Sequence, residues 1–200
     1  MNENRIVHAA HAIRNGKLIV YPTDTLYALG ADATQKNAIR SLFSIKNRPF
    51  TLPLPIAVSD MKMLNDVVYL STVAKQLADT FFPGKITLVC RKKNIILDEV
   101  TAGKNTVAVR IPDDSIALEL IKKTGPIVTT SANIHGHSTP STISEIRKLF
   151  KPGIVEVYID DGLRQNKPST IVDVTSSQPK ILRQGAISKT IIFDEVNLNE

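Results

Sequence analysis

Short apolar segments alternate with helical patterns along the chain, and this alternation restricts the fold more than any other feature. Residues 18–21, Leu-Ile-Val-Tyr, follow a helical pattern over residues 4–15 and end before Pro22. A second helical pattern covers residues 36–46. Short β-type runs interleaved with helices are typical of α/β proteins. We therefore predict an α/β fold whose sheet is mixed rather than purely parallel.

The remaining elements continue this alternation. Ser71 is a predicted helix N-cap, and Thr142 with Glu145 forms a capping box. Pro55 lacks a backbone donor, which favours an edge or a bulge for the strand that contains it. No repeat, low-complexity tract or linker divides residues 1–200, so we expect one domain. Strands are predicted at 54–58, 86–90, 106–111, 126–129, 155–159, 170–175 and 180–183, and helices at 71–82, 113–123 and 142–150.

Composition excludes several classes of protein. Of the 200 residues, 42% are hydrophobic and 22% are charged, which provides a buried core and is untypical of a disordered chain. No apolar run approaches the roughly 18 residues that a membrane span needs. The N-terminus lacks the pattern of a signal peptide. The lone Cys90 excludes a disulfide framework and a cysteine-cluster zinc site. We expect a cytoplasmic globular protein.

The charge balance favours an anionic partner. The chain has 25 Lys and Arg against 19 Asp and Glu, a net charge of +6. Such an excess suits a nucleic acid, a nucleotide or phosphate, although a solvated basic surface explains it equally well. With 5% aromatic residues and no Trp, a stacking platform for single-stranded nucleic acid is poorly supplied. Neither a GxGxxG loop nor a P-loop occurs, so any nucleotide is bound without a Gly-rich cradle.

Two segments place cations where they can meet an anion. Lys46 and Arg48 lie two residues apart where a helix ends before Pro49, and both can face one carboxylate or phosphate. Stabilisation of the helix C-terminus is the structural alternative for Lys46. Thr106 and Arg110 share one face of a predicted strand. If that face were core, Arg110 would be a costly unpaired charge, so we predict a cleft or an exposed edge position.

Hydroxyl-bearing residues gather in two further segments. Residues 21–27 carry two threonines and an aspartate after an apolar strand, and an ordinary turn explains them as well as a binding loop does. Residues 129–133, Thr-Thr-Ser-Ala-Asn, provide hydrogen bonds without charge directly after an apolar run. Such groups suit phosphate oxygens, an amino-acid carboxylate or an adenine edge. His135 and His137 lack a supporting carboxylate, so we expect them to face solvent and predict no metal site.

Seven blocks of the sequence resemble, in order, the motifs of the YrdC/Sua5 family, the L-threonylcarbamoyladenylate synthases. The resemblance covers about residues 5–187 and implies a single YrdC-like domain, a twisted mixed α/β sheet with a large basic concave cavity. The sequence resembles the short form of the family, which lacks the C-terminal domain of the longer Sua5 type. The blocks are YPTDTLYALG, KNRP, FFPGKITLV, VAVRIP, TTSANIHG, STIVD and ILRQGAI.

The resemblance also implies a reaction and its partners. In that family L-threonine, bicarbonate and ATP, the last carried with Mg²⁺, give L-threonylcarbamoyl-AMP and pyrophosphate. A transferase complex then uses the product to make N6-threonylcarbamoyladenosine at position 37 of tRNA. Two alternatives stay open: a module that binds tRNA or double-stranded RNA, and a YciO-like paralogue with another substrate. The YALG block with Ala28 favours the paralogue, whereas the intact KxR and SxN motifs favour the synthase.

Site residues carry over from the matched motifs. Lys46 and Arg48 are the implied catalytic pair, between the amino acid and the nucleotide. Three positions depart from the family pattern: Ala28 replaces a glycine, Leu52 stands where Lys or Asn is common, and Ala57 stands where longer relatives have a histidine that helps hold threonine. The resemblance places L-threonine near Thr25, Arg110, Thr129 and Ser169, and ATP near Arg48, Thr106, Ser131, Asn133, Thr139 and Arg183.

Overall fold

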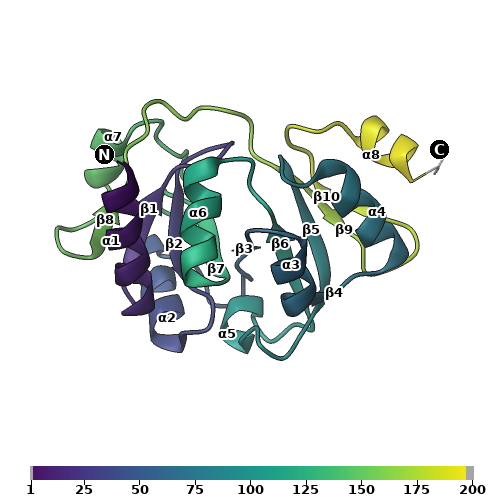
Figure 1. Cartoon of the computed structure of the whole chain (residues 1–200), viewed down its shortest axis with the longest axis horizontal. Helices are drawn as coiled ribbons and strands as arrows, with labels where there is room; N and C mark the ends of the chain where they lie inside the picture. The colour runs from purple at the N-terminus through teal and green to yellow at the C-terminus, as the bar shows by residue number, and fades with distance from the viewer. Residues whose placement is uncertain (1, 197–200) are drawn as a thin grey trace.

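The computed structural model describes residues 2–196, which form one ten-stranded mixed sheet with flanking helices (Figure 1). The helices are α1 (Asn2–Arg14), α2 (Lys36–Lys46), α3 (Met61–Val67), α4 (Thr72–Phe81), α5 (Asp98–Thr101), α6 (Ser115–Thr124), α7 (Ile143–Arg147) and α8 (Lys189–Glu195). The strands are β1 (Leu18–Tyr21), β2 (Ala28–Asp32), β3 (Ile56–Ala57), β4 (Val68–Tyr69), β5 (Ile86–Lys92), β6 (Thr106–Arg110), β7 (Ile127–Ser131), β8 (Val155–Tyr158), β9 (Thr170–Asp173) and β10 (Lys180–Arg183).

The strand order is β10-β9-β5-β6-β3-β7-β2-β1-β8, and β4 pairs with β5 beside this path. The pairs β1–β8, β3–β6 and β5–β9 are parallel, and the other pairs are antiparallel. The prediction of an α/β fold with a mixed sheet is therefore confirmed. None of the helices within residues 2–196 has the length and apolar character to cross a membrane.

Both faces of the sheet are covered around β1, which explains its continuous apolar run. Leu18 and Val20 join the core cluster that contains Phe43 of α2. Ile19 and Tyr21 point the other way, into a second cluster with residues of α1 and α6. Figure 1 shows α1 and α6 over this part of the sheet. The side-chain period of two along the strand thus supplies two separate cores.

The strands β5, β6 and β9 pack one face against the core and line a cavity with the other. Leu88, Val109 and Val172 are fully buried in the core. Their neighbours along the same strands, such as Thr87 and Ala108, line a cavity on the opposite face. Because side chains alternate along a strand, the same three strands serve as core and as cavity floor.

The prediction of an edge or a bulge at Pro55 was wrong. The strand β3 has only two residues, and it lies in the interior of the sheet between β6 and β7. Pro55 stands just before it, where no ladder bond requires its missing N–H, and its carbonyl accepts a 2.9 Å hydrogen bond from Thr129 N. The shortness of β3, rather than an edge position, accommodates the proline.

The strand predicted over 126–129 is longer than expected, because Thr130 and Ser131, expected in the loop after it, also belong to β7. Thr129, Thr130 and Ser131 pair with Gly30, Leu29 and Ala28 of β2. The sequence did not predict β2 because Ala-Leu-Gly-Ala-Asp has little intrinsic preference for a strand. Pairing on both sides, with β1 and with β7, determines its conformation. The hydroxyls of residues 129–131 are therefore fixed on a strand and not on a turn.

Helix starts were easier to predict than strand partners. Ser71 caps α4 by accepting a 3.1 Å hydrogen bond from Ala74 N, and Thr142 caps α7. Ser71 Oγ also donates to the carbonyl of Val174, 3.0 Å away. The cap thus ties the start of α4 to the segment that follows β9.

We expect Ser71→Ala to lower the free energy of unfolding by about 1 kcal/mol, because the helix loses an N-cap acceptor. Ser71→Thr is the matched control, since threonine keeps both the donor and the acceptor. Urea unfolding of the two variants and the wild type measures the difference. Equal stability of the alanine and threonine variants would show that the cap contributes nothing.

Candidate functional site

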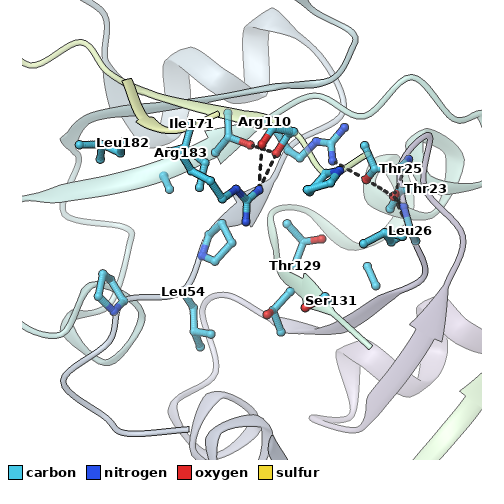
Figure 2. A pocket seen from close by; sticks show the side chains of 18 of the residues that line it. Thr23, Thr25, Leu26, Leu54, Arg110, Thr129, Ser131, Ile171, Leu182 and Arg183 are labelled. Carbon is cyan, nitrogen blue, oxygen red and sulfur yellow. Dashed lines mark hydrogen bonds between the residues drawn. The ribbon is translucent and has the colours of Figure 1, made fainter. Parts of the chain in front are cut away.

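A cavity of about 650 Å³ lies over β5, β6, β7 and β9, a size typical of small-molecule sites (Figure 2). The loop after β1 and the segment before β3 complete its wall. Two of the eleven predicted site residues, Lys46 and Asn133, do not form part of the wall and lie beneath it. The nine that line the cavity are Thr25, Arg48, Thr106, Arg110, Thr129, Ser131, Thr139, Ser169 and Arg183.

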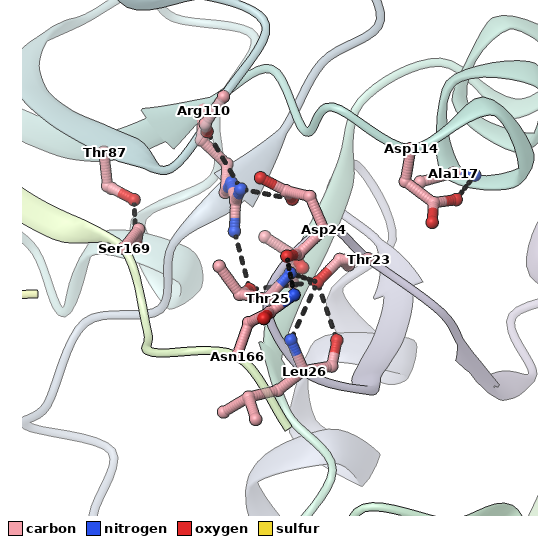
Figure 3. A network of polar contacts seen from close by, with 12 residues as sticks. Thr23, Asp24, Thr25, Leu26, Thr87, Arg110, Asp114, Ala117, Asn166 and Ser169 are labelled. Atoms are coloured by element: carbon pink, nitrogen blue, oxygen red, sulfur yellow. Dashed lines mark hydrogen bonds and ion pairs between the residues drawn. The ribbon is translucent and has the colours of Figure 1, made fainter. Parts of the chain in front are cut away.

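Arg110 is held at one end of the cavity by a buried ion pair. Its Nη2 lies 2.6 Å from Asp24 Oδ1, and both side chains are more than nine-tenths buried (Figure 3). Nη2 also donates to the carbonyl of Gly84 at 2.9 Å, and Nη1 donates to Thr25 Oγ1 at 3.2 Å. Of the two predicted settings, the exposed edge is wrong, because β6 lies between β5 and β3.

Asp24 is the residue that sequence reasoning missed. It stands in the predicted loop, directly before Thr25, but nothing in the sequence indicates that it pairs with Arg110. Asp24 Oδ2 and Arg110 Nε are buried and have no hydrogen-bond partner among residues 2–196. The need of a buried arginine for a counter-charge was the only available signal.

The loop after β1 is held by its own hydroxyl groups. Thr23 Oγ1 donates to the carbonyl of Leu26 at 2.6 Å and accepts from the backbone N–H groups of Thr25 and Leu26, both at 3.3 Å. The hydroxyls of Thr23 and Thr25 are 3.0 Å apart. Asn166 donates from Nδ2 to the carbonyl of Asp24 at 3.0 Å, which fixes the loop from outside.

A second arginine faces the first across the cavity floor. Arg183 Nη2 donates to the carbonyl of Ser169 at 2.9 Å, and Ser169 Oγ lies 2.8 Å from Thr87 Oγ1. Figure 2 shows Arg183 reaching into the cavity near Thr129. Burial lowers the pKa of the Arg183 guanidinium, and the charge of Arg110 lowers it further. An anion bound between the two guanidinium groups would reduce their mutual repulsion.

Lys46 is almost completely buried at the end of α2. Its Nζ donates to the carbonyls of Ser131 and Asn133, both at 2.6 Å, and to Asn133 Oδ1 at 2.8 Å. Burial, and secondly the charge of Arg48, lower the pKa of Lys46 to about 7. An ammonium group has three donors, and all three are used here. Lys46 therefore fixes the end of β7 and the residues after it.

Arg48 extends from the end of α2 toward the segment before β3. Its Nη2 donates to the carbonyl of Pro53 at 2.8 Å, and its Nε donates to the carbonyl of Leu52 at 3.3 Å. The Leu52 side chain itself is exposed. Burial lowers the pKa of the Arg48 guanidinium. Both oxygen partners of Arg48 are neutral carbonyls and not carboxylates. The positive charge of Arg48 is therefore not neutralised within residues 2–196 and can attract an anionic ligand.

The two histidines of the loop after β7 differ in their surroundings. His137 is exposed at the cavity wall, as expected. His135 is half-buried, contrary to the expectation, and its Nδ1 lies 3.4 Å from Arg48 Nη1. Within residues 2–196 there is no group of three or more His, Cys, Asp or Glu that could hold a metal ion.

The positions that depart from the family pattern have plain structural settings. Ala28 lies in β2 opposite Ser131 and lines the cavity. Ala57 is buried in β3, beside Arg110 in the register of β6, within the core cluster under α1 and α6. Ala57 does not belong to the cavity wall.

The fold and the site define an α/β protein with a cation-lined cavity suited to small anionic ligands. A family model described as "Telomere recombination" (Sua5_yciO_yrdC) matches residues 11–185. A putative threonylcarbamoyl-AMP synthase of Methanocaldococcus jannaschii is 39% identical over 177 residues, covering 88% of this chain and 83% of the relative. The chain belongs to the Sua5/YciO/YrdC family.

Two solved structures share the fold. The crystal structure of Pyrococcus abyssi Sua5 complexed with L-threonine superimposes with a TM-score of 0.91 at 35% identity, covering 98% of this chain and 58% of that protein. Escherichia coli YciO superimposes with a TM-score of 0.85 at 28% identity, covering 94% and 92%. This chain thus spans little more than half the length of the Pyrococcus protein.

We expect Asp24→Asn to lower the free energy of unfolding by about 3–5 kcal/mol, because it leaves the buried guanidinium of Arg110 without a counter-charge. Asp79→Asn is the control, since it removes an exposed ion pair with Lys75 and should cost no more than about 1 kcal/mol. Denaturant unfolding measures both. Similar losses in the two variants would contradict the role given to the buried pair.

The lowered pKa of Lys46 predicts how stability depends on pH. In the unfolded chain Lys46 keeps its proton up to a pH near 10.5, whereas in the folded protein it begins to lose it near 7. The unfolded state then binds more protons between these values, so the stability of the wild type relative to Lys46→Met rises with pH. The rise is at most about 1.4 kcal/mol per pH unit. Urea titrations at pH 7, 8 and 9 measure it, and a constant difference would contradict it.

Proposed function

We propose that this protein is a threonylcarbamoyl-AMP synthase, which acts in the first step of N6-threonylcarbamoyladenosine modification of tRNA. The observation that carries this proposal is the convergence of distant motifs on one cavity, with Arg110 and Ser169 at one part and Arg48 and Ser131 at another. The names of the M. jannaschii and P. abyssi relatives, and the L-threonine in the Pyrococcus structure, support it.

L-Threonine would bind at the Arg110 end of the cavity. The guanidinium of Arg110 offers a charge-assisted contact to the carboxylate. Hydroxyl groups of Thr25, Thr129 and Ser169 surround this position and can contact the amine and the remaining carboxylate oxygen. The buried Asp24 keeps the local charge near neutral, which suits a zwitterion better than a multiply charged anion.

ATP would bind along the remaining wall. Arg48 and Arg183 supply charge for the phosphates, while Thr106, Ser131 and Thr139 supply hydroxyl groups. Lys46 and Asn133 act from beneath, because their contacts hold the backbone on which Ser131 stands. Lys46 therefore contributes to the reaction by positioning residues 131–133.

The chemistry needs positioning and charge neutralisation rather than a covalent nucleophile. The amine of L-threonine captures carbon dioxide derived from bicarbonate, with loss of water, and gives a carbamate. A carbamate oxygen then attacks the α-phosphorus of ATP, and pyrophosphate leaves. Holding the two reactants in line is worth up to about 7–11 kcal/mol, because their loss of translational and rotational freedom is already complete in the bound state. Both reactants are anions that repel each other, so the site must also neutralise charge. The fixed cations Arg48 and Arg183 stabilise the charge that develops.

Mg²⁺ would arrive with the triphosphate and neutralise part of its charge. Among the residues that line the cavity, Asp173 is the one carboxylate, which fits a metal held mainly by phosphate and water rather than by a protein cage. The product would pass to the tRNA threonylcarbamoyl-transferase complex in the cytoplasm, where tRNA and ATP are available.

A YciO-like activity on another substrate is the second candidate. Ala28, the residue that distinguishes YALG from the usual YGLG, lines the cavity, and YciO shares the fold. The methyl group of Ala28 reduces the space beside Ser131, its register partner in β7. A paralogue of this kind would bind a nucleotide without any dependence on L-threonine.

The deciding experiment is mass-spectrometric detection of threonylcarbamoyl-AMP after the protein is mixed with ATP, Mg²⁺, bicarbonate and L-threonine. We expect Arg48→Ala to lower the rate at least about a hundredfold while the protein stays folded, because it removes a fixed cation at the phosphates. Arg91→Ala, on an exposed arginine outside this cavity, should keep the wild-type rate.

Product formation that needs all three substrates supports the synthase. ATP binding that is unaffected by L-threonine, with no product, would favour the YciO-like alternative. Salt-sensitive binding of tRNA or double-stranded RNA without either small-molecule activity would favour the RNA-binding module.

A further inference from the structure

Tyr21 reaches across the neighbouring strand β2, along one face of the sheet, to contact the cavity wall from the side. It is fully buried in β1, and its hydroxyl donates a 2.8 Å hydrogen bond to Thr129 Oγ1 in β7. The strand β2 lies between these two strands. Gly30 of β2 makes the crossing possible, because a Cβ there would stand 2.9 Å from Cε1 of the tyrosine ring.

The direction of this hydrogen bond determines what Thr129 offers to a ligand. Thr129 Oγ1 is the one acceptor within hydrogen-bond distance of the fully buried Tyr21 hydroxyl among residues 2–196, so the tyrosine donates; burial also raises its pKa, which keeps it protonated. A threonine hydroxyl has one proton of its own and two lone pairs. Thr129 Oγ1 thus accepts from Tyr21, and among residues 2–196 its own proton has no acceptor. Since Thr129 lines the cavity, that proton is available to a ligand there.

Thr25, at the same end of the cavity, offers a ligand an acceptor and not a donor. The proton of Thr23 goes to the carbonyl of Leu26. In the 3.0 Å contact between the two threonine hydroxyls, Thr25 must therefore be the donor. Thr25 Oγ1 also accepts from Arg110, and its remaining lone pair can accept one more hydrogen bond.

We propose that Tyr21 is a positioning residue for the amino-acid substrate: by occupying a lone pair of Thr129, it turns the Thr129 proton toward the substrate carboxylate. Arg110 and Thr129 then donate to the carboxylate, while Thr25 accepts from the amine. Two donors for the carboxylate and one acceptor for the amine allow an α-amino acid to bind in one orientation. The inference rests on the proposed synthase function.

The experiment compares steady-state kinetics of threonylcarbamoyl-AMP formation by the wild type, Tyr21→Phe, Thr129→Val and the double variant. We expect Tyr21→Phe to raise KM for L-threonine about three- to tenfold, the usual effect of one hydrogen bond, with kcat within about twofold. The double variant should be no worse than Thr129→Val, because Tyr21 acts only through that hydroxyl. Thr129→Ser, which keeps the hydroxyl, should raise KM for L-threonine less than Thr129→Val does.

A second probe separates positioning from packing. The decarboxylated analogue of L-threonine, 1-amino-2-propanol, lacks the group that Thr129 is proposed to contact. Its inhibition constant should be the same for the wild type and Tyr21→Phe. Tyr158→Phe, a half-buried tyrosine of β8 whose ring packs against Arg147, is the matched control and should leave both constants unchanged.

The possible failures are distinguishable. A wild type that forms product, with an unchanged KM in Tyr21→Phe or with additive effects in the double variant, would overturn the role of Tyr21 alone. Equal weakening of L-threonine and of the decarboxylated analogue would do the same, since it indicates a general loss of packing. A wild type that forms no product from L-threonine would overturn both the synthase function and this inference.

Discussion

The buried ion pair between Arg110 and Asp24 is the interaction on which the cavity depends. An arginine that is more than nine-tenths buried has little access to bulk water, so it requires a counter-charge inside the fold. Asp24 supplies it at 2.6 Å, and this contact attaches the loop after β1 to β6. Thr25, beside Asp24, is thereby brought within 3.2 Å of the same guanidinium. One pair of charges therefore fixes both the cation and the hydroxyl group at this end of the cavity.

The other end uses the same principle with neutral partners. Lys46 carries its charge into the core and satisfies it with two carbonyls and one amide oxygen of residues 131–133. The helix α2 is thus bound to the end of β7, and Arg48, two residues later, lines the cavity while it donates to the carbonyls of Leu52 and Pro53. Arg110 at one end and Arg48 at the other are thus oriented before any ligand binds. Little reorganisation is therefore needed when charge develops in a reaction.

The sequence predicted the parts of this molecule that are locally determined. The bounds of β1 and α2 and the cap at Ser71 follow from apolar periodicity and from side chains near in sequence. Most of the proposed site residues lie together in the cavity because the resemblance to a family carries tertiary information that periodicity lacks. The strand β2 and the partner of Arg110 were missed, since each depends on a contact between segments more than 80 residues apart.

Charge and hydroxyl direction contribute differently to such a cavity. Arginines at several positions attract any anion, and attraction that falls off slowly with distance distinguishes poorly between a carboxylate and a phosphate. A hydroxyl group distinguishes them only if its proton has a fixed direction, and an isolated threonine rotates freely. In this fold the direction of Thr129 comes from Tyr21, in the apolar cluster that shares this face of the sheet, through the space that Gly30 leaves open. Selectivity for the ligand therefore depends on core packing, and the conformation of the cavity wall cannot be separated from the apolar cluster that lies beside the cavity on the same face of the sheet.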